Sequence, residues 1–247
     1  MDSRTIGETL KKTKLVILPI GSTEQHGPHL PTGTDYFIGE EIAKRIAQRL
    51  DALLLPVIPF GFSLDHMPWP GNISLSTDTL RNIIRDVGNS LSLNGVSHII
   101  LMSGHAGHWY QLADICHELN VTKALGNTVI HNFCPYTAVS FEMLAEVLEE
   151  EMFGHAEELE TSLMLFINED LVHMERALKE YPSYIPKGLT TANYAENLRI
   201  FLSTKTVGRD TKTGVVGDAT LATKEKGEKL ISMMVDSLTE MVKRDIS

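Results

Sequence analysis

Residues 14–21 (KLVILPIG) are the stretch that decides the fold of this chain. Every residue between Lys14 and the closing Gly21 is apolar, which is typical of a β-strand that is buried on both faces. Residues 35–50 then carry apolar side chains at helical spacing, and residues 53–60 form a second apolar run. A strand, a helix and a strand in this order predict a parallel sheet with helices packed against it.

The same alternation continues along the chain. Further helices are expected at residues 6–14, 78–93 and 109–119, and further strands at residues 98–103 and 128–133. Residues 181–208 show no strong periodicity, and we expect them to be rich in loops and to lie near the site. After them, Asp218 ends a turn and is expected to cap a final helix over residues 219–243.

Length and composition favour one large domain. The chain has 247 residues, of which 43% are hydrophobic and 22% are charged, and these values are near the averages of globular proteins. We therefore expect residues 1–247 to form a single domain, with a division into two domains as the alternative.

Charge and cysteine usage limit the partners and the compartment. The formal net charge is −10 and no run of Lys and Arg concentrates positive charge, so no nucleic-acid partner is expected. The longest apolar runs are too short to cross a bilayer, so no membrane partner is expected either. Cys116 and Cys134 lack metal or redox spacing and no signal peptide is recognised, which predicts reduced, mostly buried thiols in a cytoplasmic protein.

Polar side chains that suit a metal site follow two of the expected strands. Residues 21–35 (GSTEQHGPHLPTGTD) come after the first strand, and residues 103–108 (SGHAGH) come after a later one. Parallel strands bring both segments to the same edge of the sheet, where ligands bind in open α/β folds. The side chains that can meet there are Glu24, His26, His29, Asp35, His105 and His108. Imidazole and carboxylate groups are ligands that zinc, manganese and iron accept.

Spacing separates these candidates further. Glu24 and His26 point to the same side of an extended segment and could both reach a metal pair. Asp35 begins the next helix, where its carboxylate could bridge two ions, although a simple N-cap is an equal alternative. For His29, between two prolines, ligation, loop stiffening and a substrate-facing role all remain open.

A third cluster lies at residues 154–162 (GHAEELETS). His155 and Glu160 are five residues apart, so they converge only if His155 precedes the helix. Glu160 is followed by an apolar run and is expected to be buried, which requires a cation or a metal. Glu157 and Glu158 are expected to be a solvated acidic first turn.

A loop rich in proline and glycine follows the second strand on the same sheet edge. Its candidates for substrate contact are Ser63, His66 and Trp69, with a merely structural turn as the alternative. Other hydrolase and nucleotide signatures are absent from the sequence: there is no Gly-x-Ser-x-Gly elbow, no phosphate-binding loop and no dinucleotide fingerprint.

Together these segments resemble the creatininase family, the creatinine amidohydrolases. The matching residues are 21–29 (GSTEQHGPH) with Thr34 and Asp35, then Gly104 and His105, then His155 and Ala156 with residues 160–162 (ETS), and finally residues 214–218 (GVVGD) running on to residues 225–227 (EKG). The resemblance implies a three-layer α/β/α sandwich around a mainly parallel sheet and two divalent metal ions per chain, which could be zinc, manganese or iron. It also implies a homo-oligomer, often a hexamer, that hydrolyses a cyclic or linear amide C–N bond in a small molecule through a metal-activated water.

The resemblance also implies roles for individual residues. The metal ligands are expected to be Glu24, His26, His105 and Glu160, with Asp35 as the bridge between the two ions. The catalytic candidates are His155, Glu160 and His108, of which His155, or alternatively His108, would donate a proton to the departing nitrogen. The substrate-binding candidates remain Ser63, His66, Trp69 and His29.

Departures from the family pattern bear on the substrate. Creatinine-hydrolysing members carry Tyr and a metal-binding Glu where this chain has Ala106 and Gly107, and a Trp-Asp pair where it has Glu151 and Met152. We therefore expect an amidohydrolase that is not specific for creatinine. The missing Glu makes completion of the second metal site depend on Glu160, or leaves one ion weakly bound.

Two alternatives to a general amidohydrolase remain. Gly107 agrees with another branch of the family, which includes a formylaminopyrimidine nucleotide deformylase and a peptidase-like maturation enzyme, whereas Ser103 and His108 stand where that branch carries Asn. The other alternative is a non-catalytic member that binds a metal or a ligand. The retained set of Glu24, His26, Asp35 and His105 argues against a site that has lost its chemistry.

Overall fold

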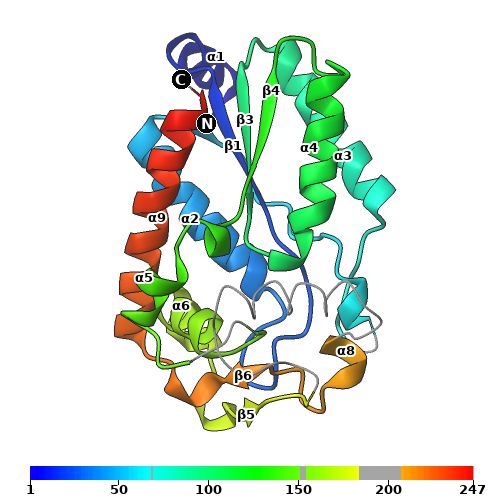
Figure 1. The fold of residues 1–247 in the computed structure, drawn as a ribbon. Coiled ribbons are helices and arrows are strands. Elements are labelled where there is room, and N and C mark those ends of the chain that lie inside the picture. The colour runs from blue at the N-terminus through cyan, green and yellow to red at the C-terminus, as the bar shows by residue number, and fades with distance from the viewer. Residues whose placement is uncertain (68, 151–153, 184–206, 247) are drawn as a thin grey trace.

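The computed structural model of the chain describes residues 1–67, 69–150, 154–183 and 207–246. It is a three-layer α/β/α sandwich in which helices cover both faces of a parallel sheet (Figure 1). The sheet has four strands in the order β2-β1-β3-β4, with all neighbouring pairs parallel. The strands are β1 (Leu15–Ile20), β2 (Leu53–Leu54), β3 (His98–Ser103) and β4 (Val129–Phe133).

The central strand β1 confirms the expectation of a strand buried on both faces. All six of its residues are buried, and the whole strand pairs with β3 from Leu15 opposite His98 to Ile20 opposite Ser103. Because the two strands run in register to their carboxyl ends, the segments that follow them emerge side by side.

The two faces of the sheet belong to two hydrophobic clusters. One face packs against α2 (Thr34–Leu50), α6 (Glu158–Asn168) and α9 (Lys224–Ile246). The other face packs against α1 (Ser3–Lys12), α3 (Thr77–Leu93) and α4 (Trp109–Val121). Alternate residues of β1 serve the two clusters, Ile17 in the first and Val16 in the second, as the two-residue period of a strand requires.

Smaller elements surround the carboxyl edge of the sheet. They are α5 (Phe141–Ala145), α8 (Val207–Asp210) and an antiparallel pair formed by β5 (Lys179–Glu180) and β6 (Gly217–Asp218). Among the described residues, no helix is long and apolar enough to span a membrane. Cys116 and Cys134 are buried and free of disulfides, as expected.

Two elements differ from the expectations. The second strand was expected at residues 53–60, but the ladder covers only Leu53–Leu54, with one isolated bridge between Ile20 and Ile58. Pro56 and Pro59 explain the interruption, because proline has no N–H to donate to a neighbouring strand.

The final helix also begins later than expected. Asp218 does act as a cap, but the turn that it caps is the short 3-10 turn Ala219–Leu221, and α9 starts at Lys224. The expectation of a loop-rich segment at residues 181–208 falls mostly on residues 184–206, and those lie outside the described part of the chain.

Helix α2 approaches the end of β3 closely, at the edge of the sheet where the candidate site residues lie. A methyl group on Gly104, just after β3, would lie 2.0 Å from the main-chain oxygen of Asp35 and 2.6 Å from the nitrogen of Gly39. Both neighbours are backbone atoms of α2, so neither could move aside without shifting the helix. Glycine at 104 therefore lets the first turn of α2 lie directly against the end of β3.

We expect Gly104→Ala to lower the free energy of unfolding by about 3 kcal/mol or more, because the added methyl group overpacks against backbone. For a chain of this length this corresponds to a fall in Tm of roughly 6–12 °C. The matched control is Gly7→Ala in α1, where nothing lies within 4 Å of the added group, and a gain of about 0.5–1 kcal/mol is expected. Equal effects of the two changes on thermal unfolding would contradict the packing argument.

Candidate metal centre

Glu24 and His26 are held by the segment that leaves β1. Both side chains are buried, at 0% and 1% exposure, and the Ser22 hydroxyl donates to Glu24 Oε2. The His26 ring donates from Nδ1 to the main-chain oxygen of Glu24 at 3.1 Å. This bond leaves Nε2 of His26 as the ring nitrogen that faces the site, which is the usual arrangement of a metal-binding histidine.

Asp35 lies between two histidines from different parts of the chain. Its Oδ1 is 3.2 Å from His26 Nε2, and its Oδ2 is 3.0 Å from His105 Nδ1. The residue is in the first turn of α2, whose N-cap is Gly33, so the alternative of a simple N-cap does not describe it. Each carboxylate oxygen therefore faces a different imidazole.

Two further carboxylates complete two groups on either side of Asp35. Glu24 Oε1 is 3.4 Å from His105 Nδ1, which makes one group of Glu24, Asp35 and His105. Glu160 Oε2 is 3.7 Å from His26 Nε2, and these two residues form the second group together with His155. His155 precedes α6 and Glu160 lies in its first turn, which is the arrangement that their spacing required.

The residues present fit divalent metal ions. Glu24 Oε1, His26 Nε2 and Asp35 Oδ2 are buried and have no hydrogen-bond partner in the structure, although charged atoms lie 3.0–3.4 Å away. A buried polar atom without a partner costs about 1–3 kcal/mol, so three of them in one place require compensation. Ligands that share a zinc ion at about 2.0–2.2 Å lie roughly 3–3.5 Å from one another, as these atoms do.

The electrostatics of the site point the same way. Burial opposes charge on every member, but Asp35, Glu160 and Glu24 outweigh it and raise the pKa of His26 to about 10. For His105 the carboxylates of Glu24 and Asp35 outweigh burial and raise the pKa to about 9. Burial would raise the pKa of Asp35, yet the two histidines hold it well below its usual range. Metal binding would replace the imidazole protons in this anionic site.

Three other histidines at the site are neutral. Burial, reinforced by the positive charge of His105 and His26, lowers the pKa of His66 to about 3. Burial is also the main reason that the pKa values of His155 and His108 lie well below the ordinary range. Each of these neutral rings therefore carries one N–H proton. The hydrogen-bond partners of the ring determine which of its two nitrogens holds that proton.

His155 and His66 lie inside the site. Their ring centroids are 4.5 Å apart, and the His26 ring is 4.3 Å from that of His155. His155 Nε2 donates to the main-chain oxygen of Gln25 at 2.6 Å, which leaves its Nδ1 lone pair available. His66 Nε2 is 3.2 Å from Glu24 Oε1, so this substrate candidate contacts a metal-ligand candidate directly.

His108 lies behind the site, with both ring nitrogens engaged by the protein. Its Nε2 accepts from the main-chain N–H of Phe62 at 3.0 Å, so the Nδ1 proton faces the Ser103 hydroxyl at 3.1 Å. A ring held in this way has no free nitrogen for a substrate. The geometry therefore favours an anchoring role for His108 over the proton donation that the sequence left open.

The remaining candidates are distributed around the site. His29 is fully buried, its Nε2 contacts the Thr161 hydroxyl of α6 at 2.9 Å, and it lies in none of the groups that could hold a metal ion. Ser63 is buried, and its hydroxyl donates to the main-chain oxygen of Ile73 at 3.3 Å. Trp69 donates from Nε1 to the main-chain oxygen of Gly208 and remains partly exposed.

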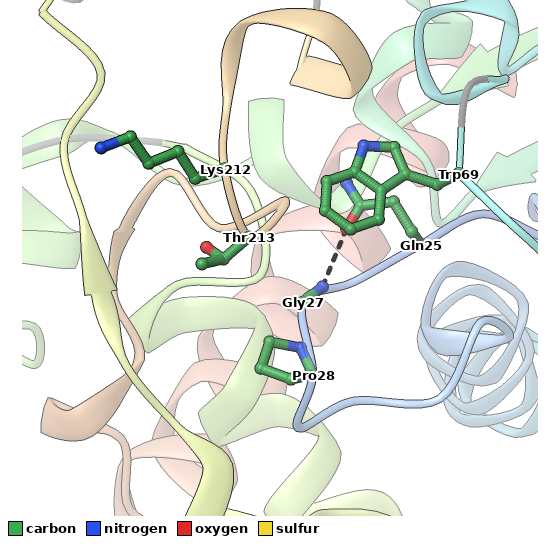
Figure 2. Close-up of a pocket in the computed structure, with 6 residues that line it drawn as sticks. All are labelled: Gln25, Gly27, Pro28, Trp69, Lys212 and Thr213. Carbon is green, nitrogen blue, oxygen red and sulfur yellow. Dashed lines mark hydrogen bonds between the residues drawn. The ribbon is translucent and has the colours of Figure 1, made fainter.

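A cavity of about 220 Å³ opens at the residues on either side of His26 in the chain (Figure 2). Its lining residues are Gln25, Gly27, Pro28, Trp69, Lys212 and Thr213. Figure 2 shows Trp69 and Gln25 among the side chains that line the cavity, and Gln25 is followed in the chain by His26. The cavity is thus placed to admit a substrate group close to the metal-ligand candidates.

The acidic first turn of α6 is not solvated as expected. Glu157 and Glu158 are 2% and 0% exposed. Glu158 forms an ion pair with Lys226 of α9 and accepts the main-chain N–H groups of Glu149 and Glu150. Lys226 is 68 residues away in the chain, so no local pattern in the sequence could reveal this pairing.

Sequence reasoning overlooked two polar residues of the site. Tyr136 follows β4 and its hydroxyl lies 3.5 Å from Glu160 Oε1, so the rule that placed the other residues at the sheet edge could have included it. Gln25, between Glu24 and His26, was not named as a candidate, yet it contacts both His66 and His155.

The whole chain is similar to one protein family. The model of the creatininase family (creatinine amidohydrolase) matches residues 1–242. The chain belongs to the creatininase family. The resemblance to the creatininase family, the three-layer α/β/α fold and the assignment to a family of amidohydrolases are thereby confirmed.

Relatives in this creatininase family include enzymes with different substrates. A mycofactocin precursor peptide peptidase from Mycobacterium tuberculosis is 27% identical, over 99% of this chain and 90% of its own. A 3-dehydro-scyllo-inosose hydrolase from Thermotoga maritima is 28% identical, over 100% and 82%. A 2-amino-5-formylamino-6-ribosylaminopyrimidin-4(3H)-one 5'-monophosphate deformylase from Methanobrevibacter smithii matches over 55% of this chain at 26% identity.

Solved creatininase structures share the fold. A crystal structure of creatinine amidohydrolase superposes with a TM-score of 0.84 at 23% identity, over 99% of this chain and 95% of its own. Related creatininase structures are described as a Zn-Zn type and as a Mn form. Metal binding in these relatives agrees with the buried His, Glu and Asp groups found here.

We expect zinc or manganese to raise the Tm of metal-stripped protein. At a hundredfold excess over Kd, a bound ligand adds about 2.7 kcal/mol, or roughly 5–10 °C for this chain length. Asp35→Asn should abolish the rise because it removes the carboxylate that lies between His26 and His105. The matched control Asp86→Asn, at an exposed position of α3, should keep it. A full rise in the Asp35 variant would contradict a centre built around this residue.

Proposed function

We propose that the chain is a metal-dependent amidohydrolase that holds two divalent ions and cleaves an amide other than creatinine. The observation that carries the proposal is the set of three buried, unpartnered polar atoms, on Glu24, His26 and Asp35, at one edge of the sheet. Crowding of this kind is stable only if a cation compensates it. Zinc, manganese and iron all accept this combination of carboxylate and imidazole ligands.

The proposed ligands fall into two sets that share Asp35. Glu24, Asp35 and His105 would hold one ion, and His26, Asp35 and Glu160 the other. Glu160 takes the place left by Gly107, where creatinine-hydrolysing members carry a Glu. Its position is supported by the main-chain N–H of Ala156, which donates to Oε2 at 2.7 Å, and by the nearby Tyr136 hydroxyl.

The ions would supply Lewis acidity, which lowers the pKa of water from 15.7 to roughly 7 and polarises the amide carbonyl. His155 would handle the proton. Its Nε2 is committed to the Gln25 carbonyl, so Nδ1 would take the proton released by the attacking water and pass it to the departing nitrogen, which leaves poorly as an anion. Burial holds the pKa of His155 well below its usual range, so the free ring is neutral and, once protonated, gives its proton up readily to the departing nitrogen.

The substrate proposal rests on what replaces the creatinine-specific residues. Ala106 and Gly107 offer neither a phenol nor a carboxylate to a small cyclic substrate. The cavity lined by Gln25 and Trp69 instead provides space next to the residues that flank His26, as a longer linear amide would require. The peptidase named among the relatives, which matches nearly the whole chain, supports a linear amide such as a peptide bond.

The alternative is a formylaminopyrimidine nucleotide deformylase, which Gly107 favours but which the partial match of the deformylase relative supports less strongly. We further propose that residues 1–247 act as one domain in a cytoplasmic homo-oligomer. The family resemblance supports a hexamer, and the two buried free cysteines agree with a reducing compartment.

We expect His155→Ala to lower kcat by about 10²–10⁴-fold, the usual contribution of a positioned acid-base group. Metal content should remain that of the unaltered protein. The matched control is His117→Ala at an exposed position of α4, which should change neither quantity. If His155→Ala lost its metal together with its activity, the residue would be a ligand and the proposed proton-transfer role would be wrong.

Substrate class is tested by assaying the zinc- or manganese-loaded protein on creatinine, a formylaminopyrimidine nucleotide and a panel of short peptides. We expect cleavage of a linear amide and at most trace activity on creatinine. Release of formate from the nucleotide alone would establish the deformylase alternative. Creatinine as the fastest substrate, or no hydrolysis by fully loaded protein, would contradict the proposal.

A further inference from the structure

His66 raises a question that distances alone do not answer. Its Nε2 lies 3.2 Å from Glu24 Oε1, and Glu24, His66 and His155 form a third group that could hold a metal ion. The separation is the same as that between His26 and Asp35 in a proposed ligand set. His66 is thus either a metal ligand or a donor beside the metal centre, and the two roles need opposite ring tautomers.

The side-chain amide of Gln25 distinguishes the two tautomers. Its oxygen accepts the main-chain N–H of Gly27 at 2.9 Å, and its nitrogen donates to the main-chain oxygen of Gly214 at 3.2 Å. An N–H must face an acceptor and a carbonyl must face a donor, so these two contacts determine which end of the amide is NH₂. The same NH₂ group lies 3.1 Å from His66 Nδ1.

The ring of His66 must therefore accept at Nδ1 and carry its proton at Nε2. A metal-binding histidine does the reverse, because it donates from one nitrogen and presents a lone pair to the ion from the other. His26 follows that rule, since its Nδ1 faces the carbonyl of Glu24. In His66 the nitrogen nearest Glu24 bears the proton instead.

The backbone holds this arrangement in place from several sides. Asn72 accepts the main-chain N–H of Gln25 at 2.6 Å and donates to the main-chain oxygen of His66. Gly214 has φ +84°, and a methyl group there would lie 1.8 Å from the Gln25 amide oxygen. Gln25 is itself 6% exposed, so its amide has little freedom to turn over.

Gln25 also determines which ring nitrogen of His155, the second neutral histidine, carries the proton. Its main-chain oxygen accepts from His155 Nε2 at 2.6 Å, so the proton of that ring lies on Nε2 and the lone pair on Nδ1. One residue therefore gives the site an imidazole that donates beside Glu24 and another that can accept. Gln25 lines the cavity in Figure 2, so both histidines are coupled to the place where a substrate would enter.

We propose that Gln25 is a positioning residue that keeps His66 as an N–H donor, so that His66 does not ligate a metal but donates to an oxygen atom beside Glu24. In the free protein this N–H only approaches Glu24 Oε1, at 3.2 Å and without a hydrogen bond, and during turnover it would donate to a substrate or water oxygen. The donation to a substrate or water oxygen rests on the proposed function. The tautomer itself is a property of the protein whether or not it hydrolyses amides.

Nitrogen NMR of protein carrying isotope-labelled histidine tests the tautomer directly, with the His66→Gln variant used to assign the signal. In both metal-free and zinc-loaded protein we expect a protonated Nε2 and an unprotonated Nδ1 at His66. A proton on Nδ1, or an Nε2 signal altered by bonding to zinc, would overturn the proposal. Failure of the hydrolysis assays would leave this readout unaffected, so the two failures can be told apart.

Two variants test the role of the amide. Gln25→Glu has no N–H to offer, so the His66 proton should move to Nδ1, whereas the control Gln48→Glu, exposed on α2, should leave it on Nε2. His66→Gln keeps an N–H donor and should retain the zinc affinity of the control His117→Gln. A loss of zinc affinity of tenfold or more in His66→Gln alone would make His66 a ligand and overturn the proposal.

Discussion

A single buried carboxylate, Asp35, is the group on which the geometry of the site depends. It is 1% exposed and has one oxygen near His26 and the other near His105. The contact between α2 and the glycine that ends β3 brings it there, because any side chain at Gly104 would push the first turn of the helix away. A shift of that turn would part the carboxylate from both histidines at once. Backbone packing and metal chemistry are thus tied together at one point of the sheet edge.

The sequence was sufficient for those parts of the structure that follow from periodicity and from the direction of parallel strands. The uninterrupted apolar run of β1 predicted a doubly covered sheet, and the common edge of β1 and β3 predicted that Glu24, His26 and His105 would meet. Hydrophobicity alone did not reveal how far the second strand extends, although Pro56 and Pro59, which lack a ladder N–H, were visible in the sequence. Nor did it reveal burial of Glu158, which depends on Lys226 in the last helix.

Six histidines lie in or around the site, and hydrogen-bond partners rather than position in the sequence separate their roles. His26 donates to a carbonyl and offers its second nitrogen to the centre, whereas His108 has both nitrogens engaged by Phe62 and Ser103. His108 was predicted as a possible proton donor because the sequence shows the residue type but not its hydrogen-bond partners. Gln25 was not named as a candidate for the same reason, although this amide contacts two of the imidazoles. Polar partners of this kind become visible only when the chain is folded.

The central claim is that two divalent ions lie on either side of Asp35, and anomalous X-ray diffraction from crystals of the zinc-loaded protein tests it most directly. The account predicts two zinc peaks per chain. One should be bound by Glu24, Asp35 and His105, and the other by His26, Asp35 and Glu160, with His66 bound to neither. A single peak away from Asp35, an ion held by His66, or no peak at saturating zinc would contradict it.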